Sequence, residues 1–200
     1  YKIVEDRRIR CHKTTGHGSE DFRHALMNSC NPAFMTIGER TGATNLYQTY
    51  RDLGLFEKTG IDLPGEANSI MHKLSDIGPV ELATMSFGQS IQISPIQFVT
   101  AAATVINGGD KITPHIGMKV TDADNQVTTN LEYPVTEQAV SSETSALMRD
   151  LLESVVAEGG GSKAQVEGYR IGGKTATSEK YPRGTGKYIS SFIGFAPANE

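Results

Sequence analysis

The stretch GGKTATSEK at 172–180 most constrains the fold, because it predicts either a phosphate-binding loop or a β-strand. Together with Gly168 it satisfies the pattern G-x-x-x-x-G-K-T. A phosphate loop needs a buried strand before it and a helix after it. Here the preceding residues are GGGSKAQVEG, and Pro182, Gly184 and Gly186 prevent a following helix. A nucleotide-binding loop is therefore the weaker interpretation.

The same stretch reads well as a strand whose side chains alternate between two faces. Lys174, Ala176 and Ser178 share one face, and Thr175 and Thr177 share the other. Such a strand can pair its backbone with an extended peptide, and a lysine beside two threonines suits a carboxylate. An ordinary edge strand with a solvated lysine remains the alternative. The run KYISSFIGFA at 187–196 predicts a second strand after the turn YPRGTG at 181–186.

The rest of the chain is richer in helical patterns. Apolar spacing, caps and stops predict helices near 22–29, 32–41, 46–53, 94–107 and 142–158 and a strand at 115–121. Ser19 is a possible cap of the first helix and Ser94 of the fourth. The packed faces are expected to hold Val99, Ala102, Ala103 and Ile106 in the fourth helix, and Leu147, Leu151 and Val155 in the fifth.

Composition excludes several classes of protein. The 200 residues suit one domain or most of one, and a net charge of −4 without a basic run disfavours nucleic acid as a partner. No apolar run is long enough for a membrane span and no signal peptide is visible, but the chain begins at Tyr1 and is expected to be a fragment. Cys11 and Cys30 are expected to be unpaired thiols. His12 and His17 lie near Cys11, but no second ligand cluster follows in the sequence, so no metal and no cofactor are expected.

A second chemical motif lies at NSCNP, residues 28–32, where two predicted helices meet. Ser29 and Asn31 are expected at a break between the helices, with the Cys30 side chain towards the core. An exposed hydroxyl beside an amide can relay a proton and hold a peptide group in acyl transfer. Simple helix capping by Ser29 or Asn31 is the alternative explanation.

Together these motifs resemble the active-site serine family of penicillin-binding proteins and β-lactamases, which carries S-x-x-K, S-x-N and K-T-G in that order. Here S-C-N stands at 29–31 and K-T-A at 174–176. The runs FEKTGIDLPGEA (56–67), ATMSFGQSIQISPIQFVTAAATVINGG (83–109) and SSFIGFAPANE (190–200) are similar to further blocks of that family. The chain resembles class B, the monofunctional D,D-transpeptidases, and CHKTTGHG before NSCNPAF is similar to the stage V sporulation protein D branch. A division or elongation paralogue remains open.

The resemblance implies a mixed α/β (α+β) transpeptidase fold, with an antiparallel sheet flanked by helices, of which residues 1–200 are a partial domain. It implies that Ser29 moves a proton, that Asn31 binds the substrate backbone, and that Lys174 supplies positive potential. Thr175, Ala176 and Thr177 would line the site for a D-Ala-D-Ala stem peptide or a β-lactam, with the Thr177 N–H as half of the oxyanion hole. It also implies an enzyme on the extracytoplasmic face of the membrane, anchored outside this chain, with cell-wall synthesis proteins as possible partners.

Two departures from the family pattern matter. Ala176 replaces the usual glycine of K-T-G; it is expected to be tolerated, although it can alter the affinity for β-lactams. No serine has a lysine three residues later, so the nucleophile is expected upstream of Tyr1 and the chain alone is expected to be inactive and less well packed.

Three other functions compete with the transpeptidase. A pseudoenzyme or binding module with the same fold would also lack S-x-x-K upstream. An α/β-hydrolase needs G-x-S-x-G, but in TMSFG at 84–88 the first glycine is Thr84. A nucleotide-binding protein would bind ATP with magnesium.

Overall fold

The fold is known from a computed structural model that describes residues 1–182 and 184–199. The chain forms two compact units. One comprises Tyr1–Phe34 and Ala146–Glu200, and the other comprises Met35–Ser145. Both motifs singled out in the sequence, at 29–31 and 174–176, belong to the first unit.

The first unit combines short helices with two antiparallel strand pairs. Its elements are β1 (Lys2–Val4), β2 (Arg7–Ile9), α1 (Phe22–Met27), the beginning of α2 (Asn31–Thr41), most of α6 (Ser142–Ala157), the 3₁₀ turn η2 (Ser162–Ala164), β7 (Gly172–Glu179) and β8 (Tyr188–Phe195). The mixed α/β class with antiparallel strands is as expected. The first helix begins differently from the prediction, because the Asp21 side chain, and not Ser19, caps α1 by accepting from the His24 N–H.

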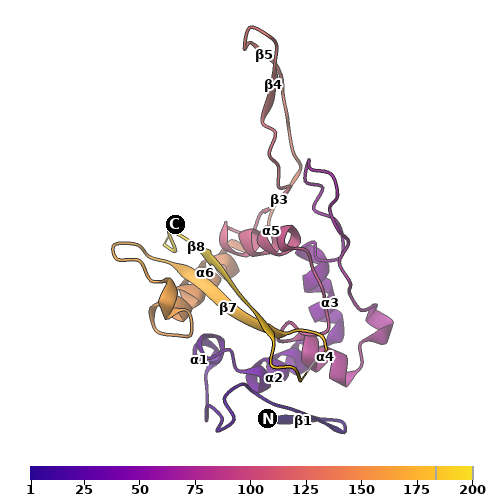
Figure 1. Cartoon of the computed structure of the whole chain (residues 1–200), viewed down its shortest axis with the longest axis vertical. Coiled ribbons are helices and arrows are strands. Elements are labelled where there is room, and N and C mark those ends of the chain that lie inside the picture. Colours follow the sequence, from indigo (N-terminus) through magenta and orange to yellow (C-terminus); the bar gives the residue numbers. More distant parts are fainter. Residues whose placement is uncertain (183, 200) are drawn as a thin grey trace. The chain divides into compact units, whose positions relative to one another are not determined.

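Strands β7 and β8 form a long antiparallel ribbon (Figure 1), which confirms that GGKTAT is a strand. Two glycines at its start allow phenylalanine rings from β8 to approach the backbone. A Cβ on Gly172 would lie 2.3 Å from the Phe195 ring, and a Cβ on Gly173 would lie 2.5 Å from the Phe192 ring. The predicted turn at 181–186 includes residue 183, which lies outside the described residues.

The core of the first unit is formed where α1 and α6 meet. Leu26, Leu151 and Val155 are buried there, and partly buried side chains surround them: Met27, Phe34, Met148 and Leu152. The expected stripe on α6 was therefore right for Leu151 and Val155. It was wrong for Leu147, whose side chain is 53% exposed, because Met148 packs on this core in its place.

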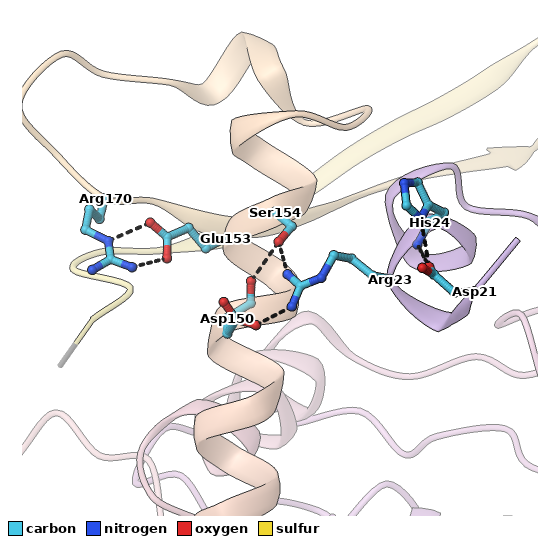
Figure 2. A network of polar contacts seen from close by, with 7 residues as sticks. All are labelled: Asp21, Arg23, His24, Asp150, Glu153, Ser154 and Arg170. Carbon is cyan, nitrogen blue, oxygen red and sulfur yellow. Dashed lines mark hydrogen bonds and ion pairs between the residues drawn. The ribbon is translucent and has the colours of Figure 1, made fainter.

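Polar contacts hold other elements of the first unit to α6 (Figure 2). Arg23 of α1 donates to Asp150 at 2.5 Å and also to the hydroxyl of Ser154. Arg170, just before β7, makes a two-pronged contact with the Glu153 carboxylate, with both N–O distances 2.6 Å. Helix α6 therefore contacts both the helix that leads to Ser29 and the segment that leads to Lys174.

The second unit is mainly helical. It contains the rest of α2, α3 (Ala43–Asp52), η1 (Leu74–Asp76), α4 (Pro79–Met85), α5 (Pro95–Ile106) and the strand pairs β3 (Lys111–Ile112) with β6 (Val135–Thr136) and β4 (Lys119–Thr121) with β5 (Val127–Asn130). The β4–β5 hairpin extends away from the helices of this unit (Figure 1). The strand predicted at 115–121 is thus shorter than expected and covers only its last three residues.

Helix α5 begins as predicted, with Ser94 as its cap and Pro95 in the first turn. The Ser94 hydroxyl accepts from the Gln97 N–H, and the Gln97 side chain accepts from the Ser94 N–H. The buried residues are Gln97, Thr100, Ala101 and Thr104. The predicted face was therefore wrong, and Val99 is 52% exposed, because Gln97 turns inward to donate to the Glu57 carbonyl.

Among the described residues, no helix has the length and apolar character required to cross a membrane.

Candidate active site

Ser29 lies in a tight turn between α1 and α2, as the sequence predicted. Its backbone is left-handed, with a φ of 50°, which is uncommon for a residue with a side chain. Two backbone hydrogen bonds close the turn: the Ser29 N–H donates to Leu26 at 3.2 Å, and the Cys30 N–H donates to Ala25 at 3.0 Å. The turn removes Ser29 from the helical face and leaves its side chain half-buried.

Asn31 begins α2 on the other side of the same turn. Its side-chain amide donates to the backbone carbonyl of Arg10 at 3.1 Å. This contact ties the segment before α1 to the Ser29 turn. Local sequence patterns do not predict this contact, because the two residues are 21 positions apart.

Lys174 reaches the Ser29 turn from β7. Its ammonium donates to the Ser29 hydroxyl at 2.9 Å and to the Thr175 carbonyl at 3.0 Å. A lysine ammonium has three N–H groups, so within the described part of the chain one is left for a further acceptor. Burial lowers the pKa of Lys174 from its ordinary value, because the charged form loses water. The lysine is therefore not the solvated side chain of an ordinary edge strand.

Residues 175–177 continue along β7 and pair with β8. Thr175 is opposite Phe192, Ala176 opposite Ser191, and Thr177 opposite Ser190. Thr175 is half-buried, whereas Ala176 and Thr177 are exposed. Among the described residues β7 pairs with β8 alone, so no second strand occupies its other edge, where an extended ligand would pair.

Gly160 is a neighbour of this site that sequence reasoning missed. Its N–H donates to the Met27 carbonyl at 3.3 Å, and a Cβ built on it would lie 3.9 Å from the Thr175 hydroxyl. The glycine-rich run 159–161, interpreted from sequence as linker-like, thus lies between the end of α1 and β7. Only its small residues hinted at such a close approach.

Cys30 is buried, as expected, and only 7% of its surface is exposed. Burial and the neighbouring Glu20 carboxylate raise the pKa of the Cys30 thiol to about 12. Burial also acts to raise the pKa of Glu20, but hydrogen bonds from Asn28 and Cys30 outweigh it and hold that pKa below its usual value. At neutral pH, Cys30 is thus a neutral thiol beside the Glu20 carboxylate.

Comparison with known proteins identifies the family. The model of the penicillin-binding protein transpeptidase domain matches residues 1–200. The chain belongs to the penicillin-binding protein transpeptidase family. The structure brings the S-x-N and K-T-A motifs together at Ser29 and Lys174.

The curated relatives are consistent with class B. The chain is 45% identical to stage V sporulation protein D of Bacillus subtilis, over 98% of this chain and 31% of the relative. It is 30% identical to a probable peptidoglycan D,D-transpeptidase, PenA, of Neisseria meningitidis, over 90% of this chain and 30% of the relative. The chain thus spans about a third of the length of the curated relatives it matches.

Solved structures confirm the fold. The D,D-transpeptidase domain of a peptidoglycan glycosyltransferase from Eggerthella lenta superposes with a TM-score of 0.86 and 25% identity, over 98% of this chain and 50% of that one. Penicillin-binding protein 3 from Mycobacterium tuberculosis, in complex with ampicillin, gives a TM-score of 0.80 and 25% identity, over 89% of this chain and 42% of that one.

Proposed function

We propose that this chain is part of a peptidoglycan D,D-transpeptidase, which crosslinks stem peptides through a serine acyl-enzyme. The 2.9 Å contact between the Lys174 ammonium and the Ser29 hydroxyl carries the proposal. It joins a potential proton carrier to a half-buried positive charge on a strand that has only one strand neighbour among the described residues. Acyl transfer to an amine needs both features.

In the proposed reaction, the nucleophilic serine comes from an S-x-x-K motif of the whole protein, upstream of Tyr1. Its oxygen attacks the carbonyl of the penultimate D-alanine, and the C–N bond to the terminal D-alanine breaks. The proton of the nucleophilic serine passes through the lysine of its motif to Ser29, and Ser29 gives a proton to the departing amine. A second stem peptide's amine then attacks the ester, and its proton returns by the same route to the serine oxygen that leaves. When Ser29 has given up its proton, the adjacent Lys174 ammonium stabilises the negative charge on the Ser29 oxygen.

The edge of β7 opposite β8 would hold the donor peptide. Its backbone groups would pair with the peptide, the Thr175 and Thr177 hydroxyls would bind the terminal carboxylate, and Lys174 would add positive potential nearby. The Thr177 N–H would donate to the developing oxyanion, together with the N–H of the nucleophilic serine. Asn31 would bind the substrate backbone from the opposite side, which requires its amide to share or leave the Arg10 carbonyl.

β-Lactams are the proposed inhibitors, because a relative in the same family has been solved with ampicillin bound. The proposed location is the extracytoplasmic face of a bacterial membrane, with the anchor outside this chain. A role in sporulation is proposed on the 45% identity to stage V sporulation protein D. Cell-wall synthesis proteins are the proposed partners.

Intact mass spectrometry with ampicillin tests the proposal on two proteins: this chain, and the chain extended upstream through the next S-x-x-K. We expect a covalent adduct on the extended protein alone. An adduct on neither protein would favour a non-catalytic module with the same fold. An adduct on the shorter chain would mean that a nucleophile lies within residues 1–200 and would contradict the proposed assignment.

A further inference from the structure

Three potential metal ligands meet beside the Ser29 turn. The two cysteine sulfurs and a ring nitrogen of His17 all lie within 4.8 Å of one another. Cys11 follows β2, His17 lies in the loop before α1, and Cys30 comes between Ser29 and Asn31. The sequence argument found no second ligand cluster for Cys11. The structure overturns that conclusion, because the turn after α1 brings Cys30 close to Cys11.

The distances suit a tetrahedral ion. The Cys11 sulfur lies 3.8 Å from Nδ1 of His17. With bonds of about 2.3 Å to sulfur and 2.1 Å to nitrogen, two ligands of a tetrahedral zinc lie about 3.6 Å apart. The spacing of Cys11 and His17 is thus close to that of two zinc ligands, and the Cys30 sulfur lies within 4.8 Å of both.

The cluster is shielded from solvent. Cys11 is 6% exposed and Cys30 is 7% exposed. The side chains of His17 and Glu20 are 5% and 6% exposed, and Glu20 Oε2 lies 4.0 Å from His17 Nδ1. A buried carboxylate and a buried imidazole are costly to desolvate unless they are bound by other groups. Glu20 lies beside both His17 and Cys30, but it is not among the groups whose ligand atoms all lie within 4.8 Å of one another, so its side chain must shift to become a fourth ligand.

We propose that Cys11, His17 and Cys30 bind a structural zinc ion, and that the Glu20 side chain shifts to complete its coordination. Two thiolates and one imidazole select zinc over magnesium or calcium, which prefer oxygen ligands. On binding, each thiol releases its proton to solvent, and the ion forms bonds to both sulfurs and to the imidazole. No electrons are transferred.

The ion would fasten the catalytic turn to the segment before α1. Cys30 is the middle residue of S-C-N, and Asn31 already donates to the carbonyl of Arg10, the residue next to Cys11. A metal bond at Cys30 would add a second link at the same place. If the proposed transpeptidase function holds, zinc removal slows acylation by ampicillin in the extended protein without removing any group that touches the drug.

Cobalt binding tests the site independently of activity. The protein, reduced and kept free of oxygen, is titrated with Co²⁺, and its absorption spectrum is recorded. We expect one equivalent to give thiolate-to-cobalt charge-transfer bands with the intense visible bands of tetrahedral cobalt, and zinc to abolish them. The wild-type spectrum does not depend on whether any variant folds.

Variants then assign the ligands. We expect Cys30→Ser and His17→Ala to weaken zinc binding at least tenfold, and Glu20→Gln to weaken it about tenfold. His24→Ala, an exposed histidine on α1, is the matched control and keeps wild-type affinity. Circular dichroism verifies that each variant is folded.

Two results would overturn the proposal. One is a reduced protein with two titratable thiols and no cobalt–thiolate band. The other is a protein isolated with Cys11 and Cys30 joined as a disulfide that, once reduced, still binds no zinc. In either case acylation by ampicillin on the extended protein remains a separate measurement, so failure of the metal site would not be confused with failure of the proposed function.

Discussion

The Lys174 ammonium and the Ser29 hydroxyl are 2.9 Å apart, although 145 residues separate them in the chain. Helix α6 explains how they meet. Arg23 contacts α6 from the helix before Ser29, and Arg170 contacts it from the segment before Lys174. The Gly160 N–H, beyond the end of α6, also donates to Met27. The contact thus depends on a scaffold that no single motif contains.

The charge on Lys174 should set an alkaline limit on acylation. Burial lowers its pKa, so the ammonium loses its proton at a pH below the ordinary lysine value of 10.5. We expect the rate of acylation by ampicillin in the extended protein to fall as pH rises through that lowered pKa. The measurement is the second-order acylation rate constant against pH.

Lys174→Arg is the control for this pH dependence, because a guanidinium keeps its charge throughout the range. We expect the variant to acylate more slowly but without the alkaline fall. An unchanged alkaline fall in this variant would assign the titration to another group.

Lys174 should also reduce stability near neutral pH. Its pKa is lower in the folded state than in the unfolded chain, so between the two values the unfolded chain binds more protons. Stability therefore rises as pH increases through that window. We expect Lys174→Met to have a higher melting temperature than wild type at pH 7. The variant should also lose the increase of stability with pH. Lys163→Met, at an exposed position, is the control and should do neither.

The backbone and the hydroxyl of Ser29 can be tested separately. Because its φ is 50°, glycine fits the turn better than alanine does. We expect Ser29→Gly to be about 1 kcal/mol more stable than Ser29→Ala in urea unfolding. Both variants of the extended protein should acylate far more slowly than wild type. Normal acylation in either would remove Ser29 from the mechanism.

Gly173 should tolerate no side chain. A Cβ there would lie 2.5 Å from the Phe192 ring and 2.7 Å from the Ile193 carbonyl, and the carbonyl cannot move without breaking the β7–β8 pairing. We expect Gly173→Ala to cost about 1–3 kcal/mol of unfolding free energy. Gly160→Ala is the matched control, since its nearest neighbour would lie at 3.6 Å. Equal effects of the two substitutions would contradict the packing argument.

The cap of α5 makes a prediction for the second unit. Ser94→Ala removes the acceptor of the Gln97 N–H and should cost about 1 kcal/mol. Ser94→Asp keeps an acceptor and should restore most of the loss. Chemical denaturation of both variants measures the difference, and an equal loss in both would show that the cap contributes nothing.

Local signals in the sequence predicted much of the fold. The Ser94 cap with Pro95, the strand at GGKTAT and the break at Ser29 were all correct, because each depends on residues a few positions apart. The family motifs then supplied the pairing of Ser29 with Lys174, which local patterns do not contain.

Errors arose where a distant partner decides the outcome. Gln97 turns inward because the Glu57 carbonyl lies there, so the buried face of α5 differs from its most apolar face. The contact of Asn31 with Arg10 and the approach of Cys30 to Cys11 also depend on tertiary structure. Sequence spacing alone does not reveal them.

A double-mutant cycle on Ser29 and Lys174 tests the central claim most directly. The second-order rate of acylation by ampicillin is measured for the extended protein, for Ser29→Ala, for Lys174→Ala and for the double variant. If the two side chains act as a unit, each single change costs about a hundredfold or more, and the double change costs little beyond the worse single one. Losses that simply multiply, or a single variant that acylates at the wild-type rate, would contradict the account.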